Sequence, residues 1–109
     1  MKLIQAIVQT DDAADLLDEL AQHGYRATRI NTAGGFLKAS NATILVGVTN
    51  DQVDGVLAAI RATCRTRSQL IDPLMLGMET GGVYLPEPIE VEVGGATVFI
   101  LDVEEFIRL

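Results

Sequence analysis

The alternation of apolar and polar positions predicts a strand and then a helix at the start of the chain. The run Leu3–Val8 (LIQAIV) is mostly apolar and is typical of a buried strand. Three residues that favour helix starts follow it, Thr10, Asp11 and Asp12. From Ala13 to His23, apolar side chains recur at helical spacing at Leu16, Leu17, Leu20 and Ala21. Gly24 then fits a helix stop.

A second unit repeats this pattern. Polar and β-branched residues alternate over Arg26–Thr32, and Thr43–Val48 is again apolar, so both segments are predicted strands. Thr49 and Gln52 have the spacing of a capping box. The helix that follows carries an apolar stripe at Val53, Val56, Leu57, Ile60 and Cys64.

The last third of the chain is less regular. No periodicity is evident over Arg65–Pro88, so a long loop is expected there. The strict alternation of Ile89–Val93 predicts a strand, and Ala96–Val103 predicts its return strand, with Gly94-Gly95 as the hairpin turn. Glu104–Leu109 is expected to pack as one helical turn.

The order of these elements predicts one domain of α+β class. With right-handed crossovers it is the ferredoxin-like βαββαβ arrangement, an antiparallel sheet with two helices on one face, plus the long loop at about 65–88. The other face of the sheet would then be apolar and uncovered, which favours association between copies of the chain.

The segment Ala33–Asn41, between the second and third strands, is the strongest candidate for ligand binding. It contains the adjacent glycines Gly34 and Gly35, followed by the apolar pair Phe36 and Leu37. Glycines allow a backbone to approach a ligand closely. Residues 20–50 contain no Asp or Glu but include Arg26, Arg29, Lys38 and His23. In a chain with a net charge of −7, this local positive charge indicates an anionic ligand.

Composition and charge exclude several other classes. The hydrophobic content of 49% excludes a disordered chain, and the net charge of −7 argues against binding of a nucleic-acid polymer. A single cysteine, Cys64, fits a reducing cytoplasm and is expected to be buried. No apolar run reaches the length of a membrane span. The only histidine, His23, lacks evident metal partners, and no pair of acids or nucleophile motif indicates an enzyme or a bound cofactor. Arg61, Arg65 and Arg67 are expected mainly at a solvated helix end, with the alternative that some of them line the ligand cleft.

The sequence resembles the PII-like cyclic di-AMP receptor proteins, a branch of the nitrogen-regulatory PII superfamily. The resemblance covers Met1 to about Arg108 and rests on these blocks: MKLIQAIVQ at the start, RAT at 26–28, TAGGFL at 32–37, N-x-T at 41–43, Gly47-Val48, VDGVLAAI at 53–60 and EVEVGGATVF at 90–99. The GGFL and EVEVGGATVF blocks together are specific.

This resemblance implies a signal-transduction receptor and not an enzyme. It implies a homotrimer that binds cyclic di-AMP in clefts between subunits, with two loops that become ordered and signal to an unknown downstream protein. In the family, the site is lined by the positions that match Arg26, Thr28, Gly35, Phe36, Leu37, Asn41, Gly47 and Phe99. Arg26 suits a phosphate, Thr28 and Asn41 suit hydrogen bonds to phosphate or adenine, and the two phenylalanines suit adenine rings.

Two positions depart from the family pattern. Gly24 stands where many members have Asn, and Arg108 stands where Gln is common. Arg108 is either a substitute phosphate contact or a solvated end residue. Two alternatives therefore stay open: a PII-type sensor of another adenine nucleotide, ATP or ADP, and a trimeric interaction scaffold that binds no ligand.

Overall fold

The computed structural model describes residues 1–31, 41–71 and 88–109. Its elements, in chain order, are β1 (Lys2–Gln9), α1 (Thr10–Gln22), β2 (Ala27–Asn31), β3 (Asn41–Val48), the 3-10 turn η1 (Asn50–Gln52), α2 (Val53–Thr63), β4 (Arg67–Ile71), β5 (Ile89–Val93) and β6 (Ala96–Asp102). The predicted strands and helices of the first half are present, and α1 begins earlier than expected, at Thr10.

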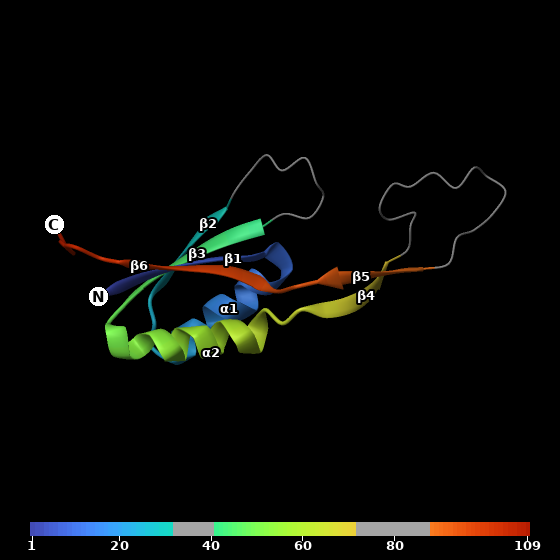
Figure 1. Ribbon diagram of the computed structural model, residues 1–109, viewed down its shortest axis with the longest axis horizontal. Helices are drawn as coiled ribbons and strands as arrows, with labels where there is room; N and C mark the ends of the chain where they lie inside the picture. The colour runs from blue at the N-terminus through green and yellow to red at the C-terminus, as the bar shows by residue number, and fades with distance from the viewer. Residues whose placement is uncertain (32–40, 72–87) are drawn as a thin grey trace.

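Four of the strands form one antiparallel sheet in the order β2-β3-β1-β6. β1 pairs with β3 and with β6, and β2 pairs with β3. Both helices lie against the same face of this sheet (Figure 1). This is the predicted ferredoxin-like arrangement, and in the described part of the chain no layer covers the opposite face, called here the open face.

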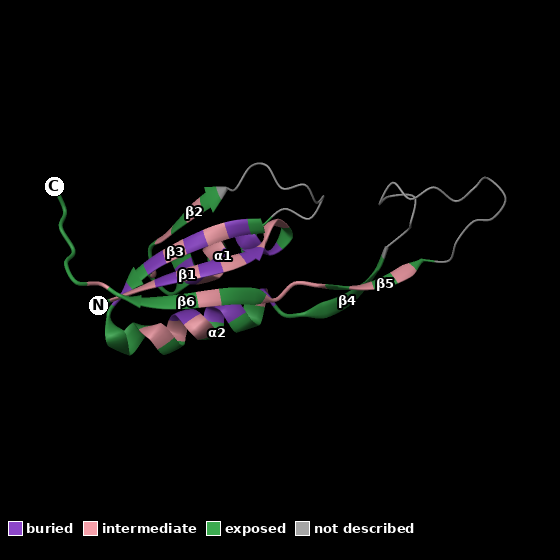
Figure 2. Ribbon diagram, turned by 45° about the horizontal axis from the view of Figure 1, so that its top comes forward, coloured by how far each residue is buried: buried purple, intermediate pink, exposed green. Residues whose placement is uncertain are grey.

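The core lies between the sheet and the helices because alternate strand residues point toward the helix layer. On β1 these residues are Ile4, Ala6 and Val8, and each is at most 1% exposed. Their cross-strand partners on β3 are buried with them, as the alternating bands of Figure 2 show. The helices complete the core with Leu16, Leu20, Val56, Ala59 and Ile60.

The end of α1 sets the course of the chain into β2. Gly24 adopts φ +79°, its N–H bonds to the carbonyl of Ala21 at 3.0 Å, and the Tyr25 N–H bonds to that of Leu20 at 2.9 Å. This is a Schellman helix stop, as predicted for Gly24. The Tyr25 ring then packs over Gly55 of α2, where any Cβ would lie 2.1 Å from the Tyr25 hydroxyl oxygen. Gly55 thus makes room for the residue that directly precedes Arg26.

The predicted capping box at the start of the second helical segment is also present. The Thr49 N–H donates to the Gln52 side-chain oxygen at 3.0 Å. The Thr49 hydroxyl donates to the Asp51 carboxylate at 2.5 Å, and this bond lowers the pKa of Asp51. The capped segment begins with one turn of 3-10 helix, η1, which leads into α2.

The prediction for the last third of the chain was partly wrong. β4, at Arg67–Ile71, lies inside the expected loop, and it pairs with β5 to form a separate two-stranded ribbon. β6 pairs with β1 instead of with β5, so Gly94 and Gly95 do not close a hairpin. They have the expected positive φ, +84° and +81°, but they carry the chain from the ribbon into the main sheet.

Close contacts hold the base of this ribbon to the domain. The Gly94 N–H donates to the Gln9 side-chain oxygen at 2.8 Å, and the Gly95 N–H donates to the Cys64 carbonyl at 2.7 Å. A Cβ on Gly94 would lie only 2.2 Å from the carbonyl oxygen of Arg65. The backbone at this junction therefore requires glycine for space as well as for φ.

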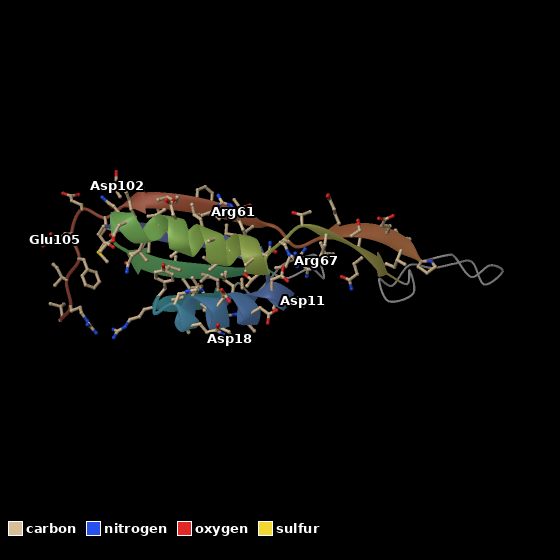
Figure 3. The ribbon with its side chains drawn as sticks, turned by 90° about the horizontal axis from the view of Figure 1, so that it is seen from below. Asp11, Asp18, Arg61, Arg67, Asp102 and Glu105 are labelled. Atoms are coloured by element: carbon tan, nitrogen blue, oxygen red, sulfur yellow. The ribbon has the colours of Figure 1, made fainter. Side chains whose placement is uncertain are left out.

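After β6 the chain forms no helical turn, contrary to prediction. Residues 104–109 have no regular structure and are exposed. Figure 3 shows Asp102 and Glu105 at one end of the molecule, and Asp11 and Arg67 near its middle, where the ribbon begins. In the described residues, no helix is long and apolar enough to cross a membrane.

Candidate functional site

A cavity of about 330 Å³ opens where β1 begins, at the end of the molecule that carries the C-terminal tail. It is formed by the start of the chain, the facing ends of β2 and β3, and the tail after β6. The lining residues are Met1, Leu3, Arg26, Thr28, Leu45, Gly47, Val103 and Phe106. Three of the predicted site residues, Arg26, Thr28 and Gly47, therefore line one cavity.

The strand register explains why these residues meet. Gly47 is paired with Leu3 across β3 and β1, and Thr28 is paired with Leu45 across β2 and β3. Paired residues project to the same face of a sheet, and so do alternate residues along a strand. Arg26 is two residues before Thr28, so its side chain shares the open face.

The lining suits an anionic ligand with an apolar part. Among the described residues that line it, Arg26 supplies the only charged side chain and Thr28 supplies a hydroxyl group, while the other side chains are apolar. A guanidinium can bind a phosphate through two parallel hydrogen bonds. A Cβ at Gly47 would lie 3.4 Å from the end of the Met1 side chain, an ordinary van der Waals contact, so Gly47 leaves this part of the wall open but is not required there by space. Apolar walls with a few polar groups are typical of small-molecule sites.

The remaining predicted residues do not line this cavity. Phe99 is half-exposed on the open face and pairs with Gln5. It stands in the same cross-strand row as Thr28 but three strands away, about 14 Å. Asn41 begins β3 and was expected in the preceding loop; it lies six residues from Gly47, about 20 Å along the strand. Gly35, Phe36 and Leu37 fall outside the described residues.

The positive charges of the acid-free stretch do not form one patch. Arg29 pairs with Ile44 of the core face, so it projects to the side of the sheet opposite Arg26, as alternation predicts. His23 lies 3.0 Å from the carboxylate of Glu19, one helical turn earlier. Lys38 falls outside the described residues. Among the described residues of this stretch, the positive charge of the open face comes from Arg26.

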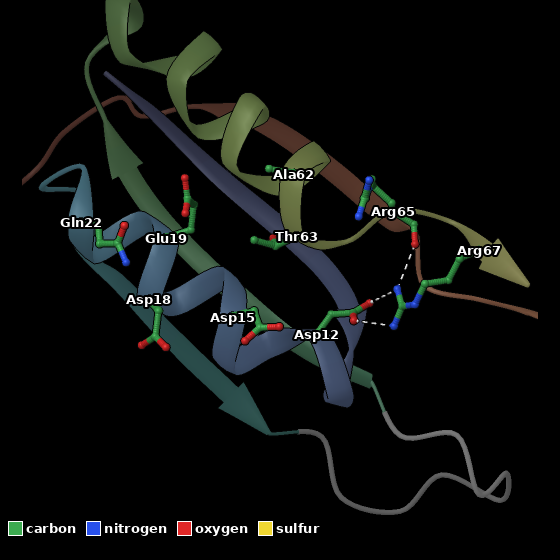
Figure 4. Close-up of a pocket in the computed structure, with 9 residues that line it drawn as sticks. All are labelled: Asp12, Asp15, Asp18, Glu19, Gln22, Ala62, Thr63, Arg65 and Arg67. Atoms are coloured by element: carbon green, nitrogen blue, oxygen red, sulfur yellow. Dashed lines mark hydrogen bonds and ion pairs between the residues drawn. The ribbon is translucent and has the colours of Figure 1, made fainter. Parts of the chain in front are cut away.

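A larger cavity of about 560 Å³ lies between α1 and α2 and is acidic (Figure 4). Its lining includes Asp12, Asp15, Asp18 and Glu19, and such a surface repels anions. Arg67 does not form the expected solvated helix end. Its guanidinium bonds to both carboxylate oxygens of the buried Asp12, at 2.8 and 3.3 Å, and ties β4 to α1.

A third cavity, of about 530 Å³, separates the end of α2 from the edge strand β6. Cys64 lines it but is 3% exposed, as predicted, and burial raises the pKa of its thiol. A buried protonated thiol is a poor nucleophile. No group of acids, histidine and cysteine within 1–31, 41–71 and 88–109 is arranged to hold a metal ion.

Sequence reasoning considered Arg108 near the C-terminus but missed the residues of the two chain ends that line the cavity. Met1, Val103 and Phe106 line the cavity although they lie far apart in the sequence. The Val103 N–H bonds to the Met1 carbonyl at 3.1 Å, and Lys2 forms an ion pair with Asp102 that lowers the pKa of that carboxyl. The available signal in the sequence was an aromatic residue, Phe106, within a short tail that also carries two glutamates and an arginine.

The structure defines a ferredoxin-like α+β domain with a small, partly apolar cavity that Arg26 lines at the open face of its sheet. The amino-acid sequence identifies the family to which the chain belongs within this fold class. It matches the Cyclic-di-AMP receptor family over residues 1–109, and the chain belongs to that family, whose members are PII-like signalling receptors and not enzymes.

Two other proteins are similar to this chain. One is the "Nitrogen fixation nifHD region GlnB-like protein 1" of Methanothermococcus thermolithotrophicus, which is 35% identical over 79 residues, 61% of this chain and 75% of the relative. The other is a crystal structure of a protein of unknown function from Pediococcus pentosaceus. It is 38% identical, with a TM-score of 0.76, over 99% of this chain and 96% of the other.

Proposed function

We propose that this protein is a receptor that binds cyclic di-AMP and signals its concentration. The observation that carries the proposal is the cavity that brings Arg26, Thr28 and Gly47 together in a chain that belongs to the Cyclic-di-AMP receptor family. Arg26 holds a phosphate, Thr28 donates to a phosphate oxygen or the base, and the apolar walls surround an adenosine half.

The complete site lies between subunits of a homotrimer. Two features of the single chain support this. The cavity of about 330 Å³ is at the small end of the range for ligand sites, roughly 300–1,000 Å³, whereas cyclic di-AMP has two adenosine halves. Asn41 and Phe99 also stand on the open face but well away from the cavity, so a neighbouring copy is needed to bring them to a ligand held by Arg26.

The open face supports association between copies. Ile30, Phe99 and Leu101 project from it and are 44–50% exposed in the single chain. Apolar area of this kind is normally covered by another protein surface. Burial of this area in a closed ring removes the exposed surface without forming an open filament.

Signalling follows from a change in population. The ligand stabilises the conformation that binds it best, and a downstream protein recognises that conformation. The predicted ordering concerns the loops at Ala33–Asn41 and about 65–88, most of whose residues lie outside the described ranges, and it stays a prediction.

Cyclic di-AMP at about 100 times its dissociation constant is expected to stabilise the folded protein by about 2.7 kcal/mol through mass action. This corresponds to a rise in Tm of roughly 10 °C. Scanning calorimetry with and without the ligand measures it, with ATP at the same concentration as the control. A Tm raised by ATP and unchanged by cyclic di-AMP would indicate instead a PII-type sensor of ATP or ADP. An unchanged Tm with both nucleotides would favour the non-binding scaffold.

A further inference from the structure

The C-terminal tail is held at the mouth of the candidate site. β6 ends at Asp102, which forms an ion pair with Lys2 at the other end of the sequence. The Val103 N–H then bonds to the Met1 carbonyl at 3.1 Å. These two contacts fix the point where the tail leaves the sheet, directly beside the start of β1 and the cavity.

Phe106 follows three residues after this anchor and lines the cavity together with Arg26 and Thr28. It is the one aromatic side chain among the lining residues of the described chain. Phe106 is 63% exposed, although an exposed phenylalanine gains little stability from apolar burial. Ile107 and Leu109 are also exposed apolar residues of the tail, but neither lines the cavity.

The cavity offers a bound ligand two kinds of contact. The Arg26 guanidinium supplies positive charge to the cavity, and the Phe106 ring supplies an aromatic surface to the same space. A nucleotide presents the matching pair of groups, an anionic phosphate and a flat base. Bases stack on aromatic side chains whatever their hydrogen-bonding edges, so the ring contributes affinity for a nucleotide.

We infer that Phe106 is an additional ligand-binding residue, whose ring stacks on an adenine of the nucleotide that Arg26 holds by its phosphate. This rests on the proposed function, because it assigns a contact within the same site. The tail then closes over the bound ligand from its anchor at Val103. Such a contact is made by the single chain, without a group from another subunit.

Replacement of Phe106 tests the inference by calorimetric titration with cyclic di-AMP. Loss of a stacking side chain is expected to weaken binding about 5- to 150-fold in Phe106→Ala. Phe106→Tyr keeps the ring and is expected to bind like the wild type. Phe106→Leu keeps apolar area without an aromatic surface and is expected to lose most of the affinity. Ile107→Ala, in the same tail but outside the cavity, is the matched control and is expected to bind normally.

Two further readouts separate stacking from a structural role. In wild-type protein, the adenine protons of bound cyclic di-AMP should shift upfield in NMR spectra because of the ring current, and Phe106→Leu should remove this shift. The oligomeric state and the Tm of the free protein should be the same in all four variants. A variant that loses both binding and the wild-type oligomeric state would show that Phe106 acts on assembly. That result would overturn the stacking contact.

The outcomes also distinguish the inference from the function on which it rests. Wild-type affinity in Phe106→Ala, with binding otherwise present, overturns the inference alone. Absence of cyclic di-AMP binding by the wild-type protein overturns the proposed function and this contact with it.

Discussion

Arg26→Ala is expected to weaken cyclic di-AMP binding about 10- to 150-fold. The estimate follows from about 1.5–3 kcal/mol for a hydrogen bond to a charged group, and a second parallel bond to the phosphate would increase it. Arg26 is exposed and belongs to no ion pair found among the described residues, so its loss should leave the fold intact. Titration calorimetry measures the affinity, and circular dichroism checks the fold.

Arg61→Ala is the matched control for this substitution. It removes the same charge from an exposed position, but on α2, which lies on the other side of the sheet from the candidate site. It is expected to keep wild-type affinity. Equal binding by the Arg26→Ala and wild-type proteins would contradict the site assignment, and equal losses in the two variants would show that only overall charge matters.

Leu101→Asp is expected to convert the proposed trimer to a monomer. Leu101 is paired with Leu3 on the open face and is 45% exposed in the single chain, so a neighbouring subunit would bury it. A carboxylate transferred into an apolar interface costs several kcal/mol without a partner. Light scattering after gel filtration should therefore give three times 11.7 kDa for the wild type and 11.7 kDa for the variant.

Gln22→Asp controls for the added negative charge. Gln22 is exposed near the acidic cavity of the helix layer, away from the open face, and this variant is expected to stay trimeric. A wild-type protein that is monomeric at all concentrations would contradict the proposed assembly. A trimer that persists in Leu101→Asp would place the interface on another surface.

Helix stops, a capping box and strand alternation predicted most of the main sheet and both helices, because the structure satisfies each of these sequence signals with residues that are close together in the chain. Gly24 stops α1 through two backbone hydrogen bonds, and the capping box at Thr49 and Gln52 marks the helical segment after β3. The alternation of β1 and β3 is set by one buried and one open face. Each of these features depends on residues close together in the chain.

The ribbon could not be predicted in the same way. The sequence Arg67–Ile71 has weak alternation, and its partner strand begins 18 residues after it ends, at Ile89. The glycines at 94 and 95 have the composition of a hairpin turn, but contacts with Gln9 and Cys64 direct the chain back to β1. Long-range pairing and not local propensity decides this part of the fold.

The candidate site, like the fold, was predictable only where it depends on residues close together in the chain. Alternation along β2 was sufficient to place Arg26 and Thr28 on one face and Arg29 on the other. The contribution of the chain ends was not predictable, because it depends on the pairing of β6 beside β1 and on the bond between Val103 and Met1. Arg67 was misassigned for a related reason: its partner, the buried carboxylate of Asp12, lies 55 residues earlier.

The most direct test of the proposed function is a calorimetric titration of the purified wild-type protein with cyclic di-AMP, with cyclic di-GMP and ATP measured in parallel. The proposal predicts saturable binding of cyclic di-AMP alone, near one ligand per subunit, despite the glycine at position 24 and the arginine at position 108. Binding of ATP without binding of cyclic di-AMP, or no heat with any of the three nucleotides, would contradict it.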